Sequence, residues 1–326
     1  MRIFRHYNDV PHTYQGAVVA LGNFDGVHRG HQALIGEAGR LAAERGAPLG
    51  VVAFEPHPRE FFRPGGPSFR LTPFRTKARL IAELGTDVMY ALAFDAEMAK
   101  KSAQEFVSDV LVEGLGVGHV VVGADFQFGK GRAGNTSVLA YMGEMEGFGV
   151  TLFEPVSAGA GKISSTEIRN ALKAGRPDEA ARLLGHWWTI ESHVIPGDKR
   201  GRTIGFPTVN MKLEGCTEPA YGIYAVRASV VENETIVAKY DGVASYGVRP
   251  MFEVSQPLLE TYLFDFSGDL YGKHLAVELI EYLRPEMKLP DLAALKAQIG
   301  RDCDAARAAL AKAGQMPPPL DPEPGR

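Results

Sequence analysis

Residues 17–31 read AVVALGNFDGVHRGH, in which an uninterrupted apolar run, residues 17–21, ends at Gly22 and polar residues follow at once. A short apolar run bounded by a turn signal is typical of a strand that is buried on both faces. The next residues, 32–44, have the spacing of a helix. A buried strand that leads through a glycine-rich turn into a helix favours an α/β fold with parallel strands.

The same alternation continues to about residue 155. Further apolar runs occupy residues 50–54, 88–94 and 120–122, and helical spacing occurs at residues 76–84 and 102–111. Short apolar strands separated by helices predict a parallel, Rossmann-like sheet with both faces covered. Ligands of such sheets bind at the carboxyl ends of the strands, so the candidate residues should follow these runs.

The pattern changes near residue 188. Two helical stretches, one through Ile168 to Leu172 and one over 177–184, lead into longer strands rich in β-branched and aromatic residues at 221–226, 259–266 and 277–283. Strands of this kind, separated by glycine and proline, predict a small antiparallel barrel or sandwich.

The chain after the barrel predicts a closing helix and a tail. Residues 291–313 form an amphipathic pattern with Leu292, Leu295 and Ile299 on one side. A proline-rich end follows and predicts disorder. We therefore expect an α/β domain at 1–186, an all-β domain at 187–314 and a disordered tail at 315–326.

Composition narrows the class of protein. The 326 residues are 45% hydrophobic and 23% charged, and the net charge is −4, so we expect neither nucleic acid nor a membrane as a partner. The first residues contain no signal-peptide core and no run of 18 apolar residues occurs. Cys216 and Cys303 have no partner motif and indicate free thiols. These features predict a cytoplasmic protein, and they do not give its oligomeric state.

The first candidate site is the pair His28 and His31, three residues apart where the first helix begins. Backbone N–H groups and the helix dipole favour an anion there. Imidazoles can donate to phosphate oxygens, and transfer at phosphorus needs positioning and charge stabilisation. Gly26 and Gly30 allow close approach of the backbone. The alternatives are a metal-binding pair, which lacks an obvious third ligand, and two capped histidines at the surface.

A second candidate is ISSTEIR, residues 163–169. Ser164 and Glu167 have the spacing of a capping box, which needs no ligand. Hydroxyls followed by Arg169 at a helix start also form a good phosphate cradle. The two interpretations are compatible.

Two further segments follow predicted strands. In GADFQFG, residues 123–129, Asp125 and Phe128 could hold and stack a planar ring; the alternative is a turn with an aromatic core residue. FEPHP, residues 54–58, has the same two interpretations.

Taken together, these four motifs resemble the FMN adenylyltransferase module of bacterial bifunctional riboflavin kinase/FAD synthetases. The resemblance implies that the histidine pair holds ATP phosphates and stabilises the transition state, while the FMN phosphate attacks the α-phosphorus. It also implies ATP-binding residues and flavin-binding residues: Asn23, His28, His31, Ser164, Ser165, Thr166 and Arg169 for ATP, and His57, Asp125 and Phe128 for flavin.

The C-terminal half contains GRTIGFPTVN, residues 201–210. Thr208 and Asn210 are two apart, so on a strand they share a face. A hydroxyl and an amide oxygen side by side suit Mg²⁺, which keeps several waters and takes its other ligands from phosphate. The alternative is a turn followed by an edge strand with two solvated polar residues.

Glu260 lies in LLETYLFDF, residues 258–266. Strand alternation places it on a face with Tyr262, Phe264 and Phe266. A carboxylate beside aromatic rings suits a general base for an alcohol, and the alternative is an exposed residue at a strand end.

These stretches resemble the riboflavin kinase module of the same family, with further matches at LYG, residues 270–272, and LRPE, residues 283–286. The resemblance implies a small antiparallel β-barrel of the six-stranded type, with Mg²⁺ at Thr208 and Asn210 and a base at Glu260. It implies an ATP-binding loop that contains Gly201, Arg202, Gly205, Phe206 and Pro207. It also implies that two arginines bind flavin or phosphate, Arg249 and Arg284. The chain departs from the family pattern at Met251 and Leu289. Both lie near the flavin-binding segments, so we expect these departures to affect the substrate affinity of the kinase module and not its chemistry.

The resemblance covers about residues 15–312 and implies two reactions on small-molecule substrates. Riboflavin and ATP would give FMN and ADP, and FMN and ATP would then give FAD and pyrophosphate. One alternative keeps a single activity. Another is a flavin- or nucleotide-sensing regulator without catalysis, which would have no need of His28, His31 or Glu260.

Overall fold

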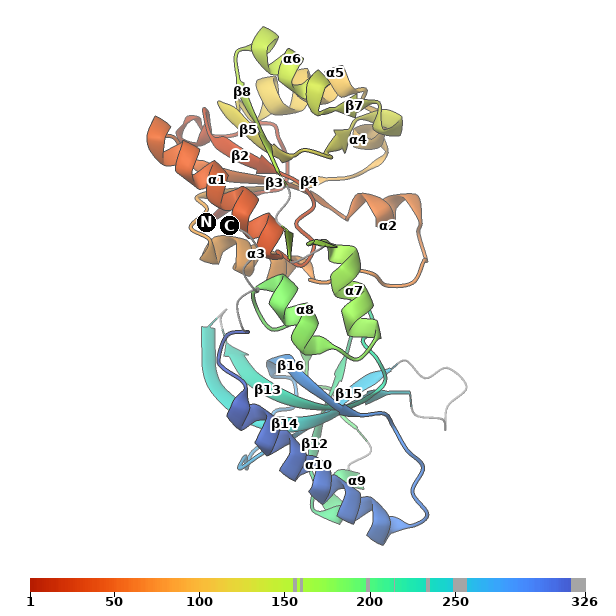
Figure 1. Cartoon of the computed structure of the whole chain (residues 1–326). Coiled ribbons are helices and arrows are strands. Elements are labelled where there is room, and N and C mark those ends of the chain that lie inside the picture. Colours follow the sequence, from red (N-terminus) through yellow and green to blue (C-terminus); the bar gives the residue numbers. More distant parts are fainter. Residues whose placement is uncertain are drawn as a thin grey trace. The chain divides into compact units, whose positions relative to one another are not determined.

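A computed structural model of the chain describes residues 1–154, 157–158, 161–197, 200–213, 215–232, 235–248 and 257–317. The chain divides into two compact units (Figure 1). We call Met1–Pro67 with Phe74–Ile163 the N-terminal unit, and Ser68–Pro73 with Ser164–Pro322 the C-terminal unit. Each is described by itself.

The N-terminal unit is built on six parallel strands in the order β1-β4-β3-β2-β5-β8. The strands are β1 (Arg2–Phe4), β2 (Val18–Leu21), β3 (Leu49–Glu55), β4 (Val88–Ala93), β5 (His119–Gly123) and β8 (Gly149–Phe153). Two short ribbons are also present: β6 (Gln127–Phe128) with β7 (Gly134–Asn135), and β9 (Ser157–Ala158) with β10 (Gly161–Lys162). The predicted parallel sheet is confirmed.

Helices cover both faces of this sheet, as the all-apolar strands require. They are α1 (Arg29–Arg45), α2 (Pro58–Phe62), α3 (Phe74–Glu83), α4 (Ala96–Lys100), α5 (Ala103–Glu105), the π-helix η2 (Phe106–Gly114) and α6 (Thr136–Glu146), with short 3₁₀ turns η1 (His12–Tyr14) and η3 (Lys130–Arg132). Val18 and Ala20 of β2 pack with α1 and α3, whereas Val19 and Leu21 pack with η2 and α6. The predicted helix 102–111 is present, but most of it is wound as η2.

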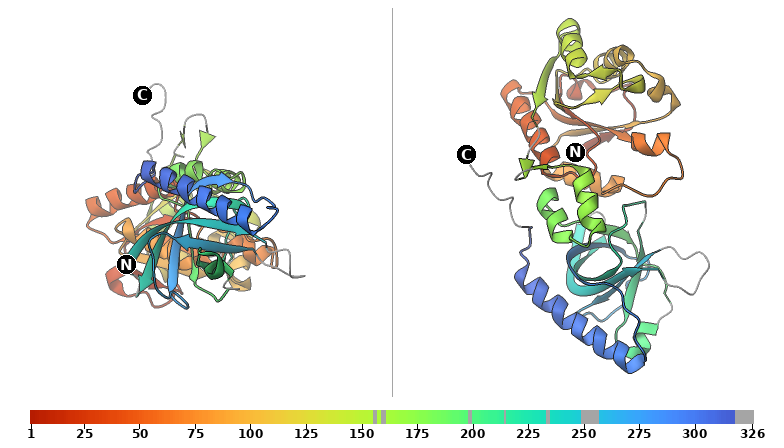
Figure 2. Two further views of the ribbon diagram at one scale, coloured as in Figure 1. Left: turned by 90° about the horizontal axis from the view of Figure 1, so that it is seen from below. Right: turned by 45° about the vertical axis from the view of Figure 1, so that its right-hand side comes forward.

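The C-terminal unit is an antiparallel six-stranded sheet in the order β11-β16-β13-β14-β15-β12. The strands are β11 (Thr189–His193), β12 (Thr208–Lys212), β13 (Gly222–Glu232), β14 (Thr235–Gly247), β15 (Leu258–Leu263) and β16 (His274–Arg284). The sheet curls strongly, as Figure 2 shows, and a bridge between Ile195 and Asn210 joins the chain after β11 to the opposite edge strand. This is the predicted barrel. The predicted strand 259–266 ends earlier, because Asp265 turns the chain with φ of 56°.

Four helices accompany the barrel: α7 (Ser165–Lys173), α8 (Pro177–Leu184), α9 (Arg200–Ile204) and α10 (Leu292–Lys312). The long helix α10 starts at an Asp291 cap, whose carboxylate accepts from the Ala294 N–H at 2.7 Å. At its other end the buried Arg227 donates to the carbonyls of Ala313 and Gly314, at 2.7 and 2.8 Å. The predicted closing helix is therefore held at both ends.

Helices α7 and α8 share one hydrophobic core with the barrel. Ile168, Leu172 and Leu184 belong to the same buried cluster as Trp188 and Tyr224. The compact units consequently divide at residues 163 and 164. The functional boundary at 186 and 187 stays a prediction, and most of the predicted disordered tail lies outside the described residues.

Candidate functional sites

His28 and His31 form one rigid pair at the start of α1. The Nδ1 atom of His28 accepts a hydrogen bond from the His31 backbone N–H at 3.3 Å and so caps the helix. The two rings stack, with centroids 3.6 Å apart and 14° between the planes. Because Nδ1 accepts, a neutral His28 carries its proton on Nε2, where it can donate to a ligand. A side chain at Gly30 would come within 3.2 Å of the His28 ring, which explains the glycine between the histidines.

The loop that leads to this pair has an unusual backbone. Phe24 and Val27 have φ values of 51° and 42°, in the left-handed region that a β-branched residue rarely adopts. Both side chains are buried, and the Phe24 ring packs edge-on against His31 at 5.2 Å. Such strained conformations gather at functional sites, where the surroundings hold them in place. The loop therefore fixes the position of both imidazoles.

The His31 ring is held neutral. Burial lowers its pKa well below the usual value, and the neighbouring His28 and Lys77 lower the pKa further. Its Nδ1 is buried and has no hydrogen-bond partner among the residues that the structure describes. Buried polar atoms are seldom left without a partner, so an orphan nitrogen beside a helix N-terminus points to a ligand.

Three predicted segments lie at the same edge of the sheet. Asn23 follows β2, His57 follows β3 and Asp125 follows β5, and these strands are neighbours in the order β3-β2-β5. Parallel strands bring their carboxyl ends together, so these residues lie along the edge at which α1 begins. His57 caps α2 by accepting from the Arg59 N–H at 3.1 Å.

Phe128 is placed differently from the other predicted flavin residues. It is only 7% exposed and packs against Phe106 and Phe126, with centroids 5.6 and 5.7 Å away. Its ring is a core side chain, and the partly exposed ring on this segment is that of Phe126. A flavin contact for Phe128 stays a prediction.

The ISSTEIR motif lies on α7, in the C-terminal unit. Ser164 caps the helix by accepting from the Glu167 N–H at 3.3 Å, which is one of the two hydrogen bonds of the predicted capping box. The Arg169 Nε donates to the Phe69 carbonyl, and its guanidinium lies 5.3 Å from the Phe69 ring centroid. The predicted phosphate contacts of Ser164, Ser165, Thr166 and Arg169 stay predictions.

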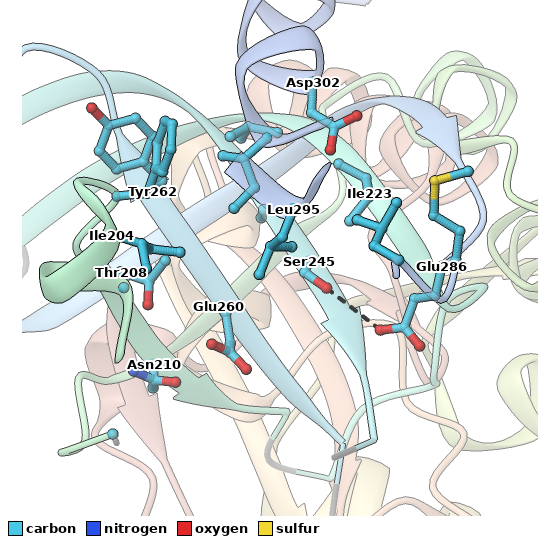
Figure 3. A pocket seen from close by; sticks show the side chains of 18 of the residues that line it. Ile204, Thr208, Asn210, Ile223, Ser245, Glu260, Tyr262, Glu286, Leu295 and Asp302 are labelled. Atoms are coloured by element: carbon cyan, nitrogen blue, oxygen red, sulfur yellow. Dashed lines mark hydrogen bonds between the residues drawn. The ribbon is translucent and has the colours of Figure 1, made fainter. Parts of the chain in front are cut away.

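A cavity of about 900 Å³ in the C-terminal unit brings together the predicted kinase residues. Thr208 and Asn210 point into it from β12, and Glu260 points into it from β15 (Figure 3). Asn210 and Glu260 are direct cross-strand partners in the antiparallel register. Gly197 packs against the Asn210 amide so closely that a side chain there would collide with it. The predicted shared face of Thr208 and Asn210 is confirmed. β12 is an edge strand, as the alternative had it, but Asn210 is buried and not solvated.

The other side of this cavity is apolar. Leu295 and Ile299 of α10 line it, and Leu295 is 37% exposed although it belongs to the apolar side of the helix. The apolar residues that α10 buries are instead Ala306, Ala309 and Leu310. An apolar helix face directed into a cavity suits a flat, apolar ligand. Leu289 also lines the cavity.

Arg284 lines the cavity too, but its guanidinium is tied to α10. It makes a two-pronged ion pair with the buried Asp302, with Nε–Oδ1 at 2.8 Å and Nη2–Oδ2 at 2.6 Å. The hydrogen bonds to Asp302 raise the pKa of Arg284. Its predicted role in flavin or phosphate binding stays a prediction. Arg249 and Met251 lie outside the described residues.

The predicted nucleotide loop borders two cavities. Gly201, Arg202 and Phe206 line the large one, and Pro207 lines a second of about 520 Å³. Gly205 has φ of 91°, which favours glycine. Three residues, Arg202, Thr208 and Tyr271, line both cavities.

Sequence reasoning missed four residues at these sites. Lys77 donates to the Asn23 carbonyl in the loop that leads to the histidine pair, and Asp302 accepts from Arg284. Ser245 and Glu286 lie 3.5 Å apart on the cavity wall (Figure 3). Glu286 is part of the LRPE match, which could have identified it as a site residue. The other three belong to no motif.

The histidine pair at the start of α1 and the cavity with Glu260, Thr208 and Asn210 are two separate candidate sites for phosphate transfer. Together they define a transferase with two sites. Residues 10–167 match the family model described as FAD synthetase, and residues 184–310 match the one described as riboflavin kinase. The chain belongs to the bifunctional riboflavin kinase/FMN adenylyltransferase family.

Curated relatives of that description match nearly the whole chain. The protein of Pseudomonas fluorescens is 41% identical over 312 residues, which span 95% of this chain and 98% of the relative. The protein of Escherichia coli (strain K12) is 40% identical over 303 residues, which span 93% and 96%.

A solved structure has the same fold. It is the crystal structure of a protein described as a macrolide-efflux protein from Streptococcus pneumoniae, with a TM-score of 0.83 and 30% identity over 94% of this chain and 98% of that one. The efflux description concerns that protein. In the described part of the present chain, no helix combines the length and the apolar character needed to cross a membrane.

Proposed function

We propose that the chain makes FAD in two steps, with one site for each step. The C-terminal unit phosphorylates riboflavin with ATP and releases FMN and ADP. The N-terminal unit joins FMN to the adenylyl group of a second ATP and releases pyrophosphate. The observation that carries the proposal is the presence of both sets of polar groups, His28 with His31 and Glu260 with Thr208 and Asn210, in a chain that matches both family models.

In the first step, Glu260 accepts the proton of the ribityl 5′-hydroxyl. The hydroxyl oxygen then forms a bond to the γ-phosphorus of ATP, and the bond to the β-phosphate oxygen breaks, with ADP as the leaving group. The apolar wall of Leu295 and Ile299 receives the flavin ring, which orients the hydroxyl toward Glu260. The adjoining smaller cavity receives the nucleotide, so that Thr208 lies where the two substrates meet.

The donor set near Glu260 fits Mg²⁺. Thr208 and Asn210 offer a hydroxyl and an amide oxygen on one strand face. Mg²⁺ prefers oxygen ligands and commonly takes only one or two from protein, with water and phosphate as the others. When bound, the ion would neutralise charge on the ATP phosphates.

In the second step, a phosphate oxygen of FMN bonds to the α-phosphorus of ATP. The bond from that phosphorus to the bridging oxygen breaks, and pyrophosphate leaves with the electron pair. His28 and His31 donate N–H hydrogen bonds to the phosphoryl oxygens, where negative charge develops. Ser164, Ser165, Thr166 and Arg169 bind the ATP, and His57, Asp125 and Phe128 contact the flavin.

We place these reactions in the cytoplasm. Both cysteines, Cys216 and Cys303, are free thiols in the structure, which suits a reducing compartment.

Product analysis tests the proposal. The purified chain is incubated with riboflavin, ATP and Mg²⁺, a parallel sample receives FMN in place of riboflavin, and flavins are separated by chromatography. We expect FMN and then FAD from the first sample, and FAD from the second. If neither sample yields product although flavin binds, the chain is a flavin-binding regulator and the proposal is wrong.

A further inference from the structure

Lys77 of α3 is a buried cation that contacts the loop leading to the histidine pair. Its side chain is 3% exposed. The ammonium Nζ lies 3.3 Å from Glu55 Oε2, at the end of β3, and donates to the Asn23 carbonyl at 3.4 Å. It therefore joins the carboxyl ends of β2 and β3, the two strands that lead to the candidate adenylyltransferase site.

A buried ammonium is costly unless its surroundings compensate it. Glu55, whose side chain is 15% exposed, compensates the charge of Lys77, but the two contacts of the ammonium are long for charged hydrogen bonds. A buried cation that is held by long contacts contributes a positive potential to its surroundings, because the low dielectric of the protein interior screens its charge only weakly.

The potential of Lys77 reaches the imidazoles. The ammonium lowers the pKa of His31, in the same direction as burial and as the neighbouring His28. The charged or titratable groups placed here include His28 and His31 from α1, Lys77 from α3, Glu55 from β3 and the buried Asp25 of the loop between β2 and α1. A ligand phosphate at the α1 N-terminus would enter the same positive potential.

We propose that Lys77 is a positioning residue for adenylyl transfer, which fixes the Asn23 and Glu55 segments at the sheet edge and supplies positive potential to the phosphates held by His28 and His31. The residue acts through the histidines and the loop, since its ammonium is enclosed. The inference rests on the proposed FMN adenylyltransferase activity of this site.

Removal of the charge tests the inference. In the full chain, Lys77→Met keeps the length of the side chain and removes the ammonium. We expect the kcat for FAD formation from FMN and ATP to fall by about 10²-fold, as for loss of one preorganised electrostatic group. Arg79→Met is the matched control, because Arg79 is a partly exposed cation two residues along the same helix; its kcat should equal that of the wild type.

The same preparations phosphorylate riboflavin at the other site, so the kinase rate reports folding and concentration. An unchanged kinase rate together with a wild-type rate of FAD formation in Lys77→Met would overturn the inference. A wild-type chain that makes no FAD from FMN would instead overturn the proposed function.

Two measurements separate an electrostatic from a merely structural role. Lys77→Arg restores the charge and should recover part of the lost kcat. In Lys77→Met, loss of the nearby charge should raise the His31 pKa and move the acid limb of the adenylyl-transfer pH profile to higher pH. If Lys77→Arg is as slow as Lys77→Met and the acid limb stays in place, the role is packing alone and the inference is wrong.

Should Lys77→Met fail to fold, proton NMR titration of the histidine ring protons in Lys77→Arg and wild type replaces it. His31 is assigned by its absence in His31→Gln. We expect His31 to titrate alike in wild type and Lys77→Arg, well below the pH at which an exposed histidine titrates. A His31 that titrates like an exposed histidine would overturn the inference.

Discussion

Glu260 and Asn210 face each other across the β12–β15 pair, and Thr208 is one strand repeat away. This geometry places a proton acceptor beside two oxygen donors at the boundary of two cavities. The role proposed for Glu260 needs its carboxylate charge, which an amide of the same shape lacks.

Glu260→Gln should therefore slow riboflavin phosphorylation by about 10²- to 10⁴-fold, the usual contribution of a general base. FAD formation from added FMN should stay within about twofold of wild type, because the histidine pair lies in the other unit. The control is Glu281→Gln, an exposed glutamate of β16 in the same sheet. Full kinase activity in Glu260→Gln would remove the residue from the mechanism.

Local patterns were sufficient to predict some of these residues. Thr208 with Asn210, and His28 with His31, stand two or three positions apart, so strand alternation or helix geometry fixes their relation. Lys77 could not be predicted in this way, because its partner Glu55 is 22 residues away and the contact depends on how α3 packs. Asp302 is likewise 18 residues from Arg284.

At the scale of elements, α10 forms one wall of the large cavity, and the Arg284–Asp302 pair ties it to the end of β16. The amphipathic pattern predicted this helix correctly. The pattern could not tell that Leu295 faces a cavity, because apolar side chains in a core and in a ligand site look alike in sequence.

Asp302→Asn should release α10. Loss of the charge on Asp302 leaves Arg284 partly buried with a weaker partner, at a cost on the order of 3 kcal/mol. We expect a lower unfolding temperature and a higher KM for riboflavin, with the KM for FMN in the second reaction unchanged. Steady-state kinetics and thermal unfolding measure this, with the exposed Asp304→Asn as control. Equal riboflavin KM values for Asp302→Asn and wild type would show that the pair does not shape the pocket.

The packing of α7 against the barrel is a second feature at the scale of elements. Its Leu172 is 1% exposed in a cluster with barrel residues. The ISSTEIR motif predicted the helix and its cap, but the apolar residues on its inner face do not indicate which sheet they cover.

Leu172→Ala should destabilise the C-terminal unit by about 2–5 kcal/mol, as buried leucine truncations do. Both tryptophans of the chain, Trp187 and Trp188, are in that unit, so tryptophan fluorescence reports its unfolding. The fluorescence midpoint should fall in Leu172→Ala and stay in place in Leu139→Ala, a fully buried site of the N-terminal unit. The reverse pattern would assign α7 to the other unit.

At the scale of the whole molecule, buried histidines make stability depend on pH. Burial lowers the pKa of His119, whose Nε2 lies 2.8 Å from Thr151 Oγ1, and that of His31. The unfolded chain therefore binds protons at a higher pH than the folded chain, so stability is present above pH 6.5 and is lost as the pH falls below it.

Thermal unfolding followed by far-UV circular dichroism should show a lower midpoint at pH 5.5 than at pH 7.5. His119→Gln cannot titrate, and its midpoint should fall less over the same interval. An equal fall in His119→Gln and wild type would show that His119 does not contribute.

In the proposed sequence, the kinase site releases FMN and the separate adenylyltransferase site binds it. A mixing experiment tests this sequence most directly. His28→Ala should convert riboflavin to FMN only, and Glu260→Gln should convert FMN but not riboflavin to FAD. Chromatography of an equimolar mixture of the two variants, given riboflavin, ATP and Mg²⁺, should show FAD. Should the mixture stay without FAD although each variant keeps its single activity, FMN does not pass freely between the sites. Should each variant lose both activities while folded, the two reactions share one site and the account is wrong.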